Sequence, residues 1–231
     1  LGSTRGIYHQ SGNVNINGKA VTANFWYSSY SVTRSLQLGG GSITLSGTGT
    51  VIDMTTGTGY TQVDQITFIL SDTASAKTVY FGQGSSASLG LHAPIIRVGG
   101  SASFTMIGRF RSPDFTTNNY TGALTIGTAG TWVSLYGNVT FNTGMTTVAG
   151  TVVLYFSDTV SSQTITTNSV TINVPVTFEG TAGATLADNF TVGSSKATTI
   201  TAGTVNLNNK VLTTASFSSS GTTTRTLAFG T

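Results

Sequence analysis

Short β-type runs separated by turn residues occupy residues 197–231 and constrain the fold of this 231-residue chain most strongly. The runs at residues 199–201, 204–207 and 211–213 alternate apolar and polar side chains, with Ala-Gly and Asn-Asn-Lys between them. A helical period does not fit, because apolar residues do not recur at both i+3 and i+4 and β-branched residues dominate. Each run predicts one short strand, and the series predicts rungs of a coil that stacks on itself.

Internal repetition also indicates a stacked coil. Residues 42–52 align with residues 123–133 at an offset of 81, and the Ser-Asp-Thr pattern at residues 71–78 recurs at residues 157–164 at an offset of 86. One turn of a parallel β-helix takes roughly 20 to 25 residues, so each long unit is expected to contain several turns. The sequence therefore predicts an all-β chain with a parallel β-helix or β-solenoid architecture, and β-sandwich-type fibre domains are the alternative.

The expected organisation has two parts. Residues 1–35 form an aromatic-rich N-terminal segment, which is either a cap or the end of a preceding repeat. The Asn-Gly pair at residues 17–18 of this segment predicts a tight turn. Residues 36–231 form the β-repeat region, with long units near 42–122, 123–189 and 190–231. Both ends of the sequence suggest a piece of a longer polypeptide.

Composition argues for a folded chain with an unusual surface. Charged residues make up 7% of the sequence, whereas hydrophobic residues make up 38% and aromatic residues 10%; disordered chains show the opposite bias. The surface must consist of Thr, Ser, Asn and Gly, and we expect part of it to be buried against other subunits. The net charge of +3 comes from scattered residues, so nucleic acid is not an expected partner. No apolar run is long enough for a membrane helix, so membrane insertion is not expected.

Three sequence motifs near the C-terminus resemble a known class of proteins. The stretches V-N-L-N-N-K-V-L-T-T at residues 205–214, F-S-S-S at 217–220 and T-R-T-L-A-F-G-T at 224–231 are similar to a recurrent unit in repeat-rich structural and adhesin-like proteins of marine tailed phages. The resemblance covers about the last 60 residues, and a weaker similarity begins at Leu124. We expect the N-terminal part to lack these sequence motifs. It implies a β-solenoid-like virion or surface fibre and no catalytic residues.

The acidic residues give little support for an enzyme. Carboxylate pairs in glycoside hydrolases lie about 5 to 9.5 Å apart, and the best candidates for such a pair are Asp53, Asp64 and Asp114. Asp72 and Asp158 occupy equivalent repeat positions, which indicates that both form turns.

Other catalytic and ligand-binding groups are scarce as well. His9 and His92 are the only histidines, neither lies in a recognisable catalytic context, and both are expected on the polar surface. The chain has no cysteine, so disulfides, thiolate catalysis and zinc ribbons are excluded. We expect no catalytic, cofactor-binding or metal site, and no enzyme activity.

The predicted function is that of a structural protein at the virion surface or outside the cell. It would be a segment of a phage tail fibre, a whisker or another virion appendage, in contact with other virion proteins and with a host cell-surface glycan. A bacterial surface adhesin or pilus-like filament subunit is the alternative. A polysaccharide depolymerase and an ice-binding solenoid, which needs ranks of Thr-x-Thr on a flat face, are less favoured.

The expected assembly is a homo-oligomer. The runs at residues 66–70 and 152–156 are nearly continuous in apolar residues, which is typical of strands buried on both faces. Three chains around a common axis would cover the outward residues, and a head-to-tail filament is the alternative.

Overall fold

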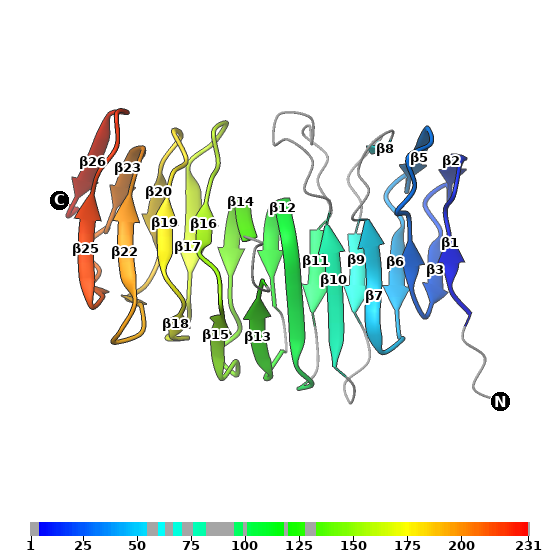
Figure 1. The fold of residues 1–231 in the computed structure, drawn as a ribbon, viewed down its shortest axis with the longest axis horizontal. Helices are drawn as coiled ribbons and strands as arrows, with labels where there is room; N and C mark the ends of the chain where they lie inside the picture. The colour runs from blue at the N-terminus through cyan, green and yellow to red at the C-terminus, as the bar shows by residue number, and fades with distance from the viewer. Residues whose placement is uncertain are drawn as a thin grey trace.

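The chain folds into one elongated stack of β-strands. The structure is a computed structural model that describes residues 5–54, 60–62, 67–70, 76–81, 95–98, 101–117, 120–127 and 133–230. Every regular element in these residues is a strand, and the strand pairings are parallel. The first and last strands lie at opposite ends of the stack (Figure 1). The predicted all-β solenoid is confirmed.

Three columns of strands run along the stack, and each turn of chain, here called a rung, passes through columns 1, 2 and 3 in order. Column 1 contains β1 (Ile7–Tyr8), β4 (Trp26–Tyr27), β7 (Gly49–Met54), β10 (Lys77–Phe81), the start of β12 (Phe104–Thr116), β13 (Ala123–Ile126), β15 (Thr147–Gly150), β18 (Ile172–Asn173), β21 (Phe190–Thr191) and β24 (Leu212–Thr213). Column 2 contains β2 (Gly12–Asn15), β5 (Arg34–Gln37), β8 (Tyr60–Gln62), the middle of β12, the start of β14 (Val133–Thr140), β16 (Leu154–Phe156), β19 (Val176–Phe178), β22 (Ala197–Ile200) and β25 (Ser216–Ser219). Column 3 contains β3 (Ala20–Ala23), β6 (Ser42–Leu45), β9 (Thr67–Leu70), β11 (Ile95–Val98), the ends of β12 and β14, β17 (Gln163–Thr166), β20 (Ala184–Leu186), β23 (Gly203–Asn206) and β26 (Arg225–Ala228).

The apolar core follows from the period-two alternation of the strands. Side chains of successive residues point to opposite faces of a strand, so β22 buries Thr198 and Ile200 while Ala197 and Thr199 stay partly exposed. In-register pairing then stacks each inward side chain on its equivalent in the next rung. One such buried row in column 3 is Ile43, Phe68, Phe115, Val139, Ile165 and Leu186.

Tight corners with left-handed backbone end many of the strands. Asn17 and Gly18 both have positive φ, and the amide of Lys19 donates to the carbonyl of Ile16 at 3.0 Å. The predicted Asn-Gly turn is therefore confirmed. Asn208 and Asn209 form a similar corner with positive φ, because asparagine tolerates this region better than most residues.

The position of these corners changes along the stack. Asn17–Gly18 and Gly39–Gly40 lie between column 2 and column 3, whereas Asn168–Ser169 and Asn208–Asn209 lie between column 3 and column 1. The change occurs at β12, which runs through all three columns as one strand. The step from Ile96 to its partner Phe115 is 19 residues, whereas the step from Phe68 to Ile96 is 28. After β12, the tight corners therefore lie one side further along the rung than they do before β12.

This shift explains where the similar segments lie. Residues 42–45 form β6 in column 3, and their equivalents at the offset of 81, residues 123–126, form β13 in column 1. The two segments are alike in local pattern but do not stack in one column. In the pair at the offset of 86, residues 71–75 lie outside the described part of the chain. Residues 5–35 supply β1 to β4 and the start of β5, as part of the same stack.

In the two nearly continuous apolar runs, buried and half-buried residues alternate along the strand. Leu154 and Phe156 are buried, whereas Val153 and Tyr155 are half-buried. In β9, Phe68 and Leu70 are buried and Ile69 is half-buried. The outward apolar side chains of these runs are therefore only partly covered by their own chain.

An aromatic stack in the C-terminal half offers a test of the core. The rings of Phe156 and Phe178 stack at 5.1 Å between centroids, and Phe190 packs against Phe178 at 5.9 Å. We expect Phe178→Ala to lower the free energy of unfolding by about 3 to 5 kcal/mol, because it leaves a cavity between rungs. Denaturant unfolding followed by circular dichroism measures this. The control Val160→Ala changes a residue that is 65% exposed and should have an effect of less than about 0.5 kcal/mol; equal losses for the two variants would contradict the described core.

Candidate functional site

Of the three carboxylates proposed for a glycosidase, the structure describes the side chain of Asp53 only. Asp53 lies on β7 and is half-buried. Asp64 lies outside the described residues, and only the backbone of Asp114 is described, in β12. Within the described part of the chain, no three His, Cys, Asp or Glu residues form a group that could hold a metal ion.

Asp158 forms a turn, as predicted. Its carboxylate accepts a hydrogen bond from the amide of Val160 at 2.8 Å, and the residue is almost fully buried. This is the local hydrogen bonding that favours Asp in turns. Asp72, its predicted equivalent, lies outside the described residues.

The expected surface position of His9 is wrong. His9 is 3% exposed, its ring packs 5.4 Å from that of Trp26, and its Nε2 lies 3.0 Å from the carbonyl oxygen of Gly12. The physical reason is the alternation that continues from β1, in which Ile7 points inward, Tyr8 outward and His9 inward. The position of His92 lies outside the described residues.

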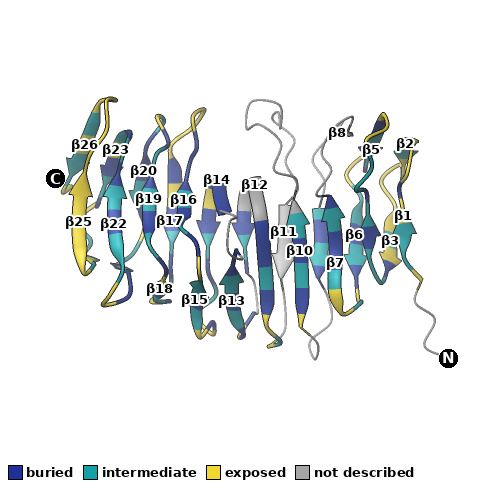
Figure 2. Cartoon of the chain, viewed as in Figure 1, coloured by how far each residue is buried: buried dark blue, intermediate teal, exposed yellow. Residues whose placement is uncertain are grey.

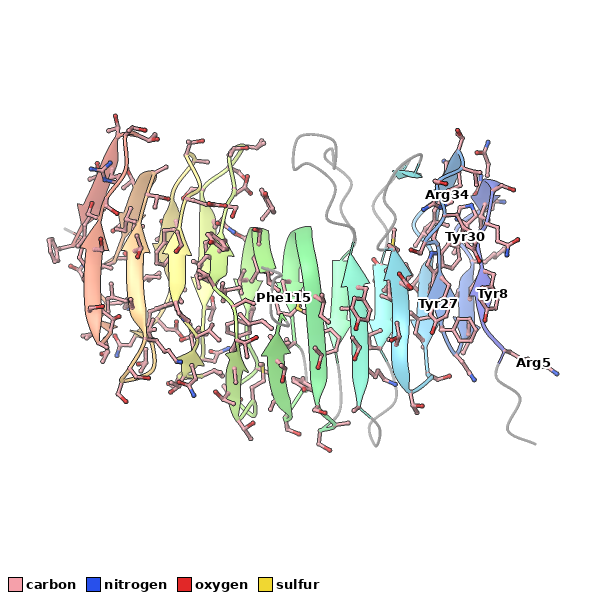
Figure 3. The ribbon with its side chains drawn as sticks, viewed as in Figure 1. Arg5, Tyr8, Tyr27, Tyr30, Arg34 and Phe115 are labelled. Carbon is pink, nitrogen blue, oxygen red and sulfur yellow. The ribbon has the colours of Figure 1, made fainter. Side chains whose placement is uncertain are left out.

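Two loops of equal design are the most distinctive polar feature. In the first, Arg34 Nε donates to Ser28 Oγ at 2.7 Å, and its Nη1 donates to the carbonyl oxygens of Tyr30 and, at 2.9 Å, Val32. Its Nη2 donates to the carbonyl oxygen of Ser28. The guanidinium thus holds a loop formed by the six residues before it, and we call residues 28–34 the first arginine corner. Figure 3 shows Arg34 and Tyr30 near the N-terminal end of the stack.

The second arginine corner, residues 219–225, repeats these contacts at the same spacing. Arg225 Nε donates to Ser219 Oγ at 3.2 Å, and its Nη1 donates to the carbonyl oxygens of Gly221 and Thr223 at 2.6 and 2.7 Å. Both corners share the pattern Ser-Ser-x-x-x-Thr-Arg-[Ser/Thr]-Leu-x-[Leu/Phe]-Gly. The expectation that the N-terminal part lacks the C-terminal sequence motifs is therefore wrong for this arginine-containing motif. The spacing of six residues between Ser and Arg, at Ser28–Arg34 and Ser219–Arg225, is the sequence signal that could have revealed the shared motif.

The two corners differ in what covers them. The first belongs to an interior rung, since β5 pairs with a strand on either side, and Arg34 is 0% exposed. The second lies on the last rung (β24, β25 and β26), where Arg225 is partly exposed. Figure 2 shows the same contrast in the strands, since β25 is exposed along its length whereas β22 beside it is not.

An aromatic cluster lies on the outer face of column 1 near the N-terminal end. Tyr8 is 58% exposed and meets the rings of Phe25 and Tyr27 edge to face at 5.1 and 5.6 Å. Tyr27 donates its hydroxyl to the carbonyl oxygen of Thr50 at 2.9 Å. Partial burial, followed by electrostatic interaction with Tyr8 and Asp53, raises the pKa of Tyr27 above its usual value.

Threonines form a single outward row in the same column. Pairing in register aligns Thr50, Thr78, Thr105 and Thr125. The neighbouring outward row contains Tyr27, Asp53 and Tyr80. Two adjacent threonine ranks, which an ice-binding face needs, are therefore not formed here.

A recess between the C-terminal rungs is too small for a substrate. It is lined by Phe156, Gln163 and Phe178 among others and has a cavity volume of about 0 Å³ for a water-sized sphere, whereas small-molecule sites usually hold about 300 to 1,000 Å³. Gln163 also donates to the carbonyl oxygens of Leu135 and Gly137 at 3.0 and 2.7 Å, so its amide has a structural role.

Comparison with protein-family models, with curated proteins and with solved structures gave no significant match. In the part of the chain that the structure describes, no helix is long and apolar enough to span a membrane.

The paired arginine corners give a prediction with an internal control. We expect Arg34→Met to lower the free energy of unfolding by about 3 to 5 kcal/mol, because it removes the donor to the buried hydroxyl and carbonyl of Ser28, at about 1 to 3 kcal/mol for each buried group, and to the partly buried carbonyls of Tyr30 and Val32. Arg225→Met should cost about 1 kcal/mol or less, since water reaches the same groups in the second corner. Urea unfolding of both variants measures the difference, and equal losses would show that burial of the corner does not set its contribution.

Proposed function

We propose that this chain is a structural protein, a segment of a phage tail fibre, a whisker or another virion appendage, with attachment to a host surface as a further role. One observation carries the proposal: the described residues form a continuous stack in which each rung is supported only by its neighbours. Such a stack transmits force along its axis and can be lengthened without a change of design. Surface threonine, serine and asparagine keep it hydrated with few charges.

The enzymatic alternative has less support. A depolymerase needs two carboxylates at a fixed separation in a groove. In the described residues, the carboxylate of Asp158 accepts a hydrogen bond from the amide of Val160 in its own turn, and that of Asp188 accepts one from the amide of Thr167 in the preceding rung. An ice-binding role has less support as well, because the threonine row in column 1 is single.

A homo-oligomer is part of the proposal. Ile69 and Tyr155 are half-buried and point outward from the stack. Full burial of an exposed apolar side chain contributes roughly 1.5 to 3 kcal/mol, and these half-buried side chains would gain part of that. A closed ring of three chains buries them without open-ended growth.

The location of the protein tests the proposed function. Antibodies against the purified chain, used for immunogold electron microscopy of the source culture, should label appendages that project from phage particles. Label on the bacterial envelope in the absence of particles would contradict a virion role and favour the second candidate, a bacterial surface adhesin or pilus-like filament subunit.

The subunit number is tested separately. Native mass spectrometry of the chain should give three times the monomer mass of 23.8 kDa, and Tyr155→Lys should shift the population toward monomer because a charge then faces the partner. A wild-type chain that does not form trimers at micromolar concentration would contradict the trimer.

A further inference from the structure

The outward face of column 1 combines aromatic rings with one carboxylate. Pairing in register places Tyr8, Tyr27, Asp53 and Tyr80 in a single row, one residue on each of four successive strands. Because neighbouring strands lie about 4.8 Å apart, the row presents ring, ring, carboxylate and ring at that interval along the stack. Tyr27, Asp53 and Tyr80 are half-buried, so each keeps part of its side chain at the surface.

This row belongs mainly to interior rungs. β4, β7 and β10 each pair with a strand on either side, and their outward side chains point away from the axis of the stack. The trimer contacts proposed above involve Ile69 of β9 and Tyr155 of β16, in columns 3 and 2. Column 1 is therefore the side of the rung that those contacts leave to a ligand.

The rings at the N-terminal end of the row are held in place by their neighbours. The hydroxyl of Tyr27 donates to the carbonyl oxygen of Thr50 at 2.9 Å, and its ring centroid lies 4.3 Å from that of Phe25. Gly6 makes room for Phe25, since a Cβ at this position would lie 1.9 Å from the phenyl ring. Tyr8 meets both rings edge to face (Figure 3). A ligand therefore meets ordered rings, which lowers the entropy cost of binding.

Hydrogen-bonding groups lie beside the rings. Thr50, Thr78 and Thr105 form the neighbouring outward row and are half-buried. Their hydroxyl groups can donate and accept hydrogen bonds, whereas the ionised carboxylate of Asp53 accepts only. The face thus offers apolar ring surface and acceptors for hydroxyl donors at short intervals.

We propose that this face binds a neutral glycan chain, with sugar rings stacked on the tyrosines and sugar hydroxyl groups donating to Asp53. The C–H groups on the face of a sugar ring are weakly positive and pack on the negative face of an aromatic ring. One sugar unit has a length close to the strand spacing of about 4.8 Å, so successive sugars can follow successive rungs. The inference rests on the proposed function, because it names the site and the ligand class for attachment to a host surface.

Charge selects this ligand over two others. An anionic polysaccharide would be repelled by the carboxylate of Asp53 and by the negative faces of the rings. A second protein chain is less suited, because charged residues are depleted from the centre of protein interfaces, and Asp53 lies between Tyr27 and Tyr80 in the row. A neutral glycan supplies both the C–H faces and the hydroxyl donors.

Affinity electrophoresis tests the ligand class. The wild-type chain is run in native gels that contain dextran, pullulan, mannan or hydroxyethyl cellulose, which are neutral, or carboxymethyl cellulose, which is anionic. We expect at least one of the neutral polysaccharides to retard the chain. Failure of all four to retard it would overturn the inference. Retardation by carboxymethyl cellulose that Tyr80→Ala abolishes would overturn the choice of a neutral ligand.

Substitutions locate the binding on this face. Tyr8→Ala and Tyr80→Ala should each weaken the retardation at least fivefold, because each removes a stacking surface, and Asp53→Ala should do so because it removes the acceptor. Tyr80→Phe keeps the ring and should bind as the wild type does. The matched control Phe217→Ala removes a ring that is 43% exposed on another column and should have no effect. Unchanged retardation of Tyr8→Ala and Tyr80→Ala would overturn the site.

Two further measurements separate the site from other causes. Circular dichroism of the variants should match that of the wild type, and Tyr8→Ala, at a side chain that is 58% exposed, carries the test if Tyr80→Ala fails to fold. Native mass spectrometry should give the same subunit number for the wild type and the variants. A shift to monomer in Tyr80→Ala would show a contact between copies of the chain and overturn the glycan site.

The immunogold experiment distinguishes failure of this site from failure of the proposed function. Label on phage appendages together with no glycan retardation would refute the site and leave the structural role intact. Label on the bacterial envelope in the absence of particles would refute the virion role, whether or not the glycan binds.

Discussion

Hydrogen bonding between each strand and the strand one turn away is the interaction on which the rest of this structure depends. A parallel pair needs a long connection, and here the other two sides of the rung provide it. The pairing fixes the register, and the register places inward side chains such as Val139 on Ile165. The apolar rows, the threonine row and the aromatic cluster are all consequences of this one repeat.

Because contacts reach only neighbouring rungs, the stack tolerates local change. At β12 the tight corner moves from one side of the rung to the next, while the alternation of inward and outward residues continues. The hydrogen-bonded strand ladder depends on the alternation of inward and outward residues, whereas the corners between the strands can differ. The same property allows one arginine corner to occur in an interior rung, at Arg34, and again in the last described rung, at Arg225.

Local patterns made much of the fold predictable. The alternation at residues 199–207 and the Asn-Gly pair at Asn17–Gly18 act over a few residues, and both gave correct expectations. The burial of His9 was missed because its environment depends on Trp26, a rung away. The arginine corners were missed because their residues are six apart and differ between the two copies except at Ser, Thr and Arg. The shift at β12 could not be inferred, since it depends on which strands pair, and similar sequences occur in different columns.

Formation of a disulfide between register partners tests the stacked ladder most directly. Thr177 and Thr199 face outward on adjacent strands, whereas Ser218 lies one rung beyond Thr199. The account predicts an intramolecular disulfide in Thr177→Cys with Thr199→Cys and none in Thr177→Cys with Ser218→Cys, where the separation of about 9.6 Å exceeds the reach of the bond. Equal intramolecular cross-linking of the two pairs, or none in the first, would contradict the parallel register on which the solenoid rests.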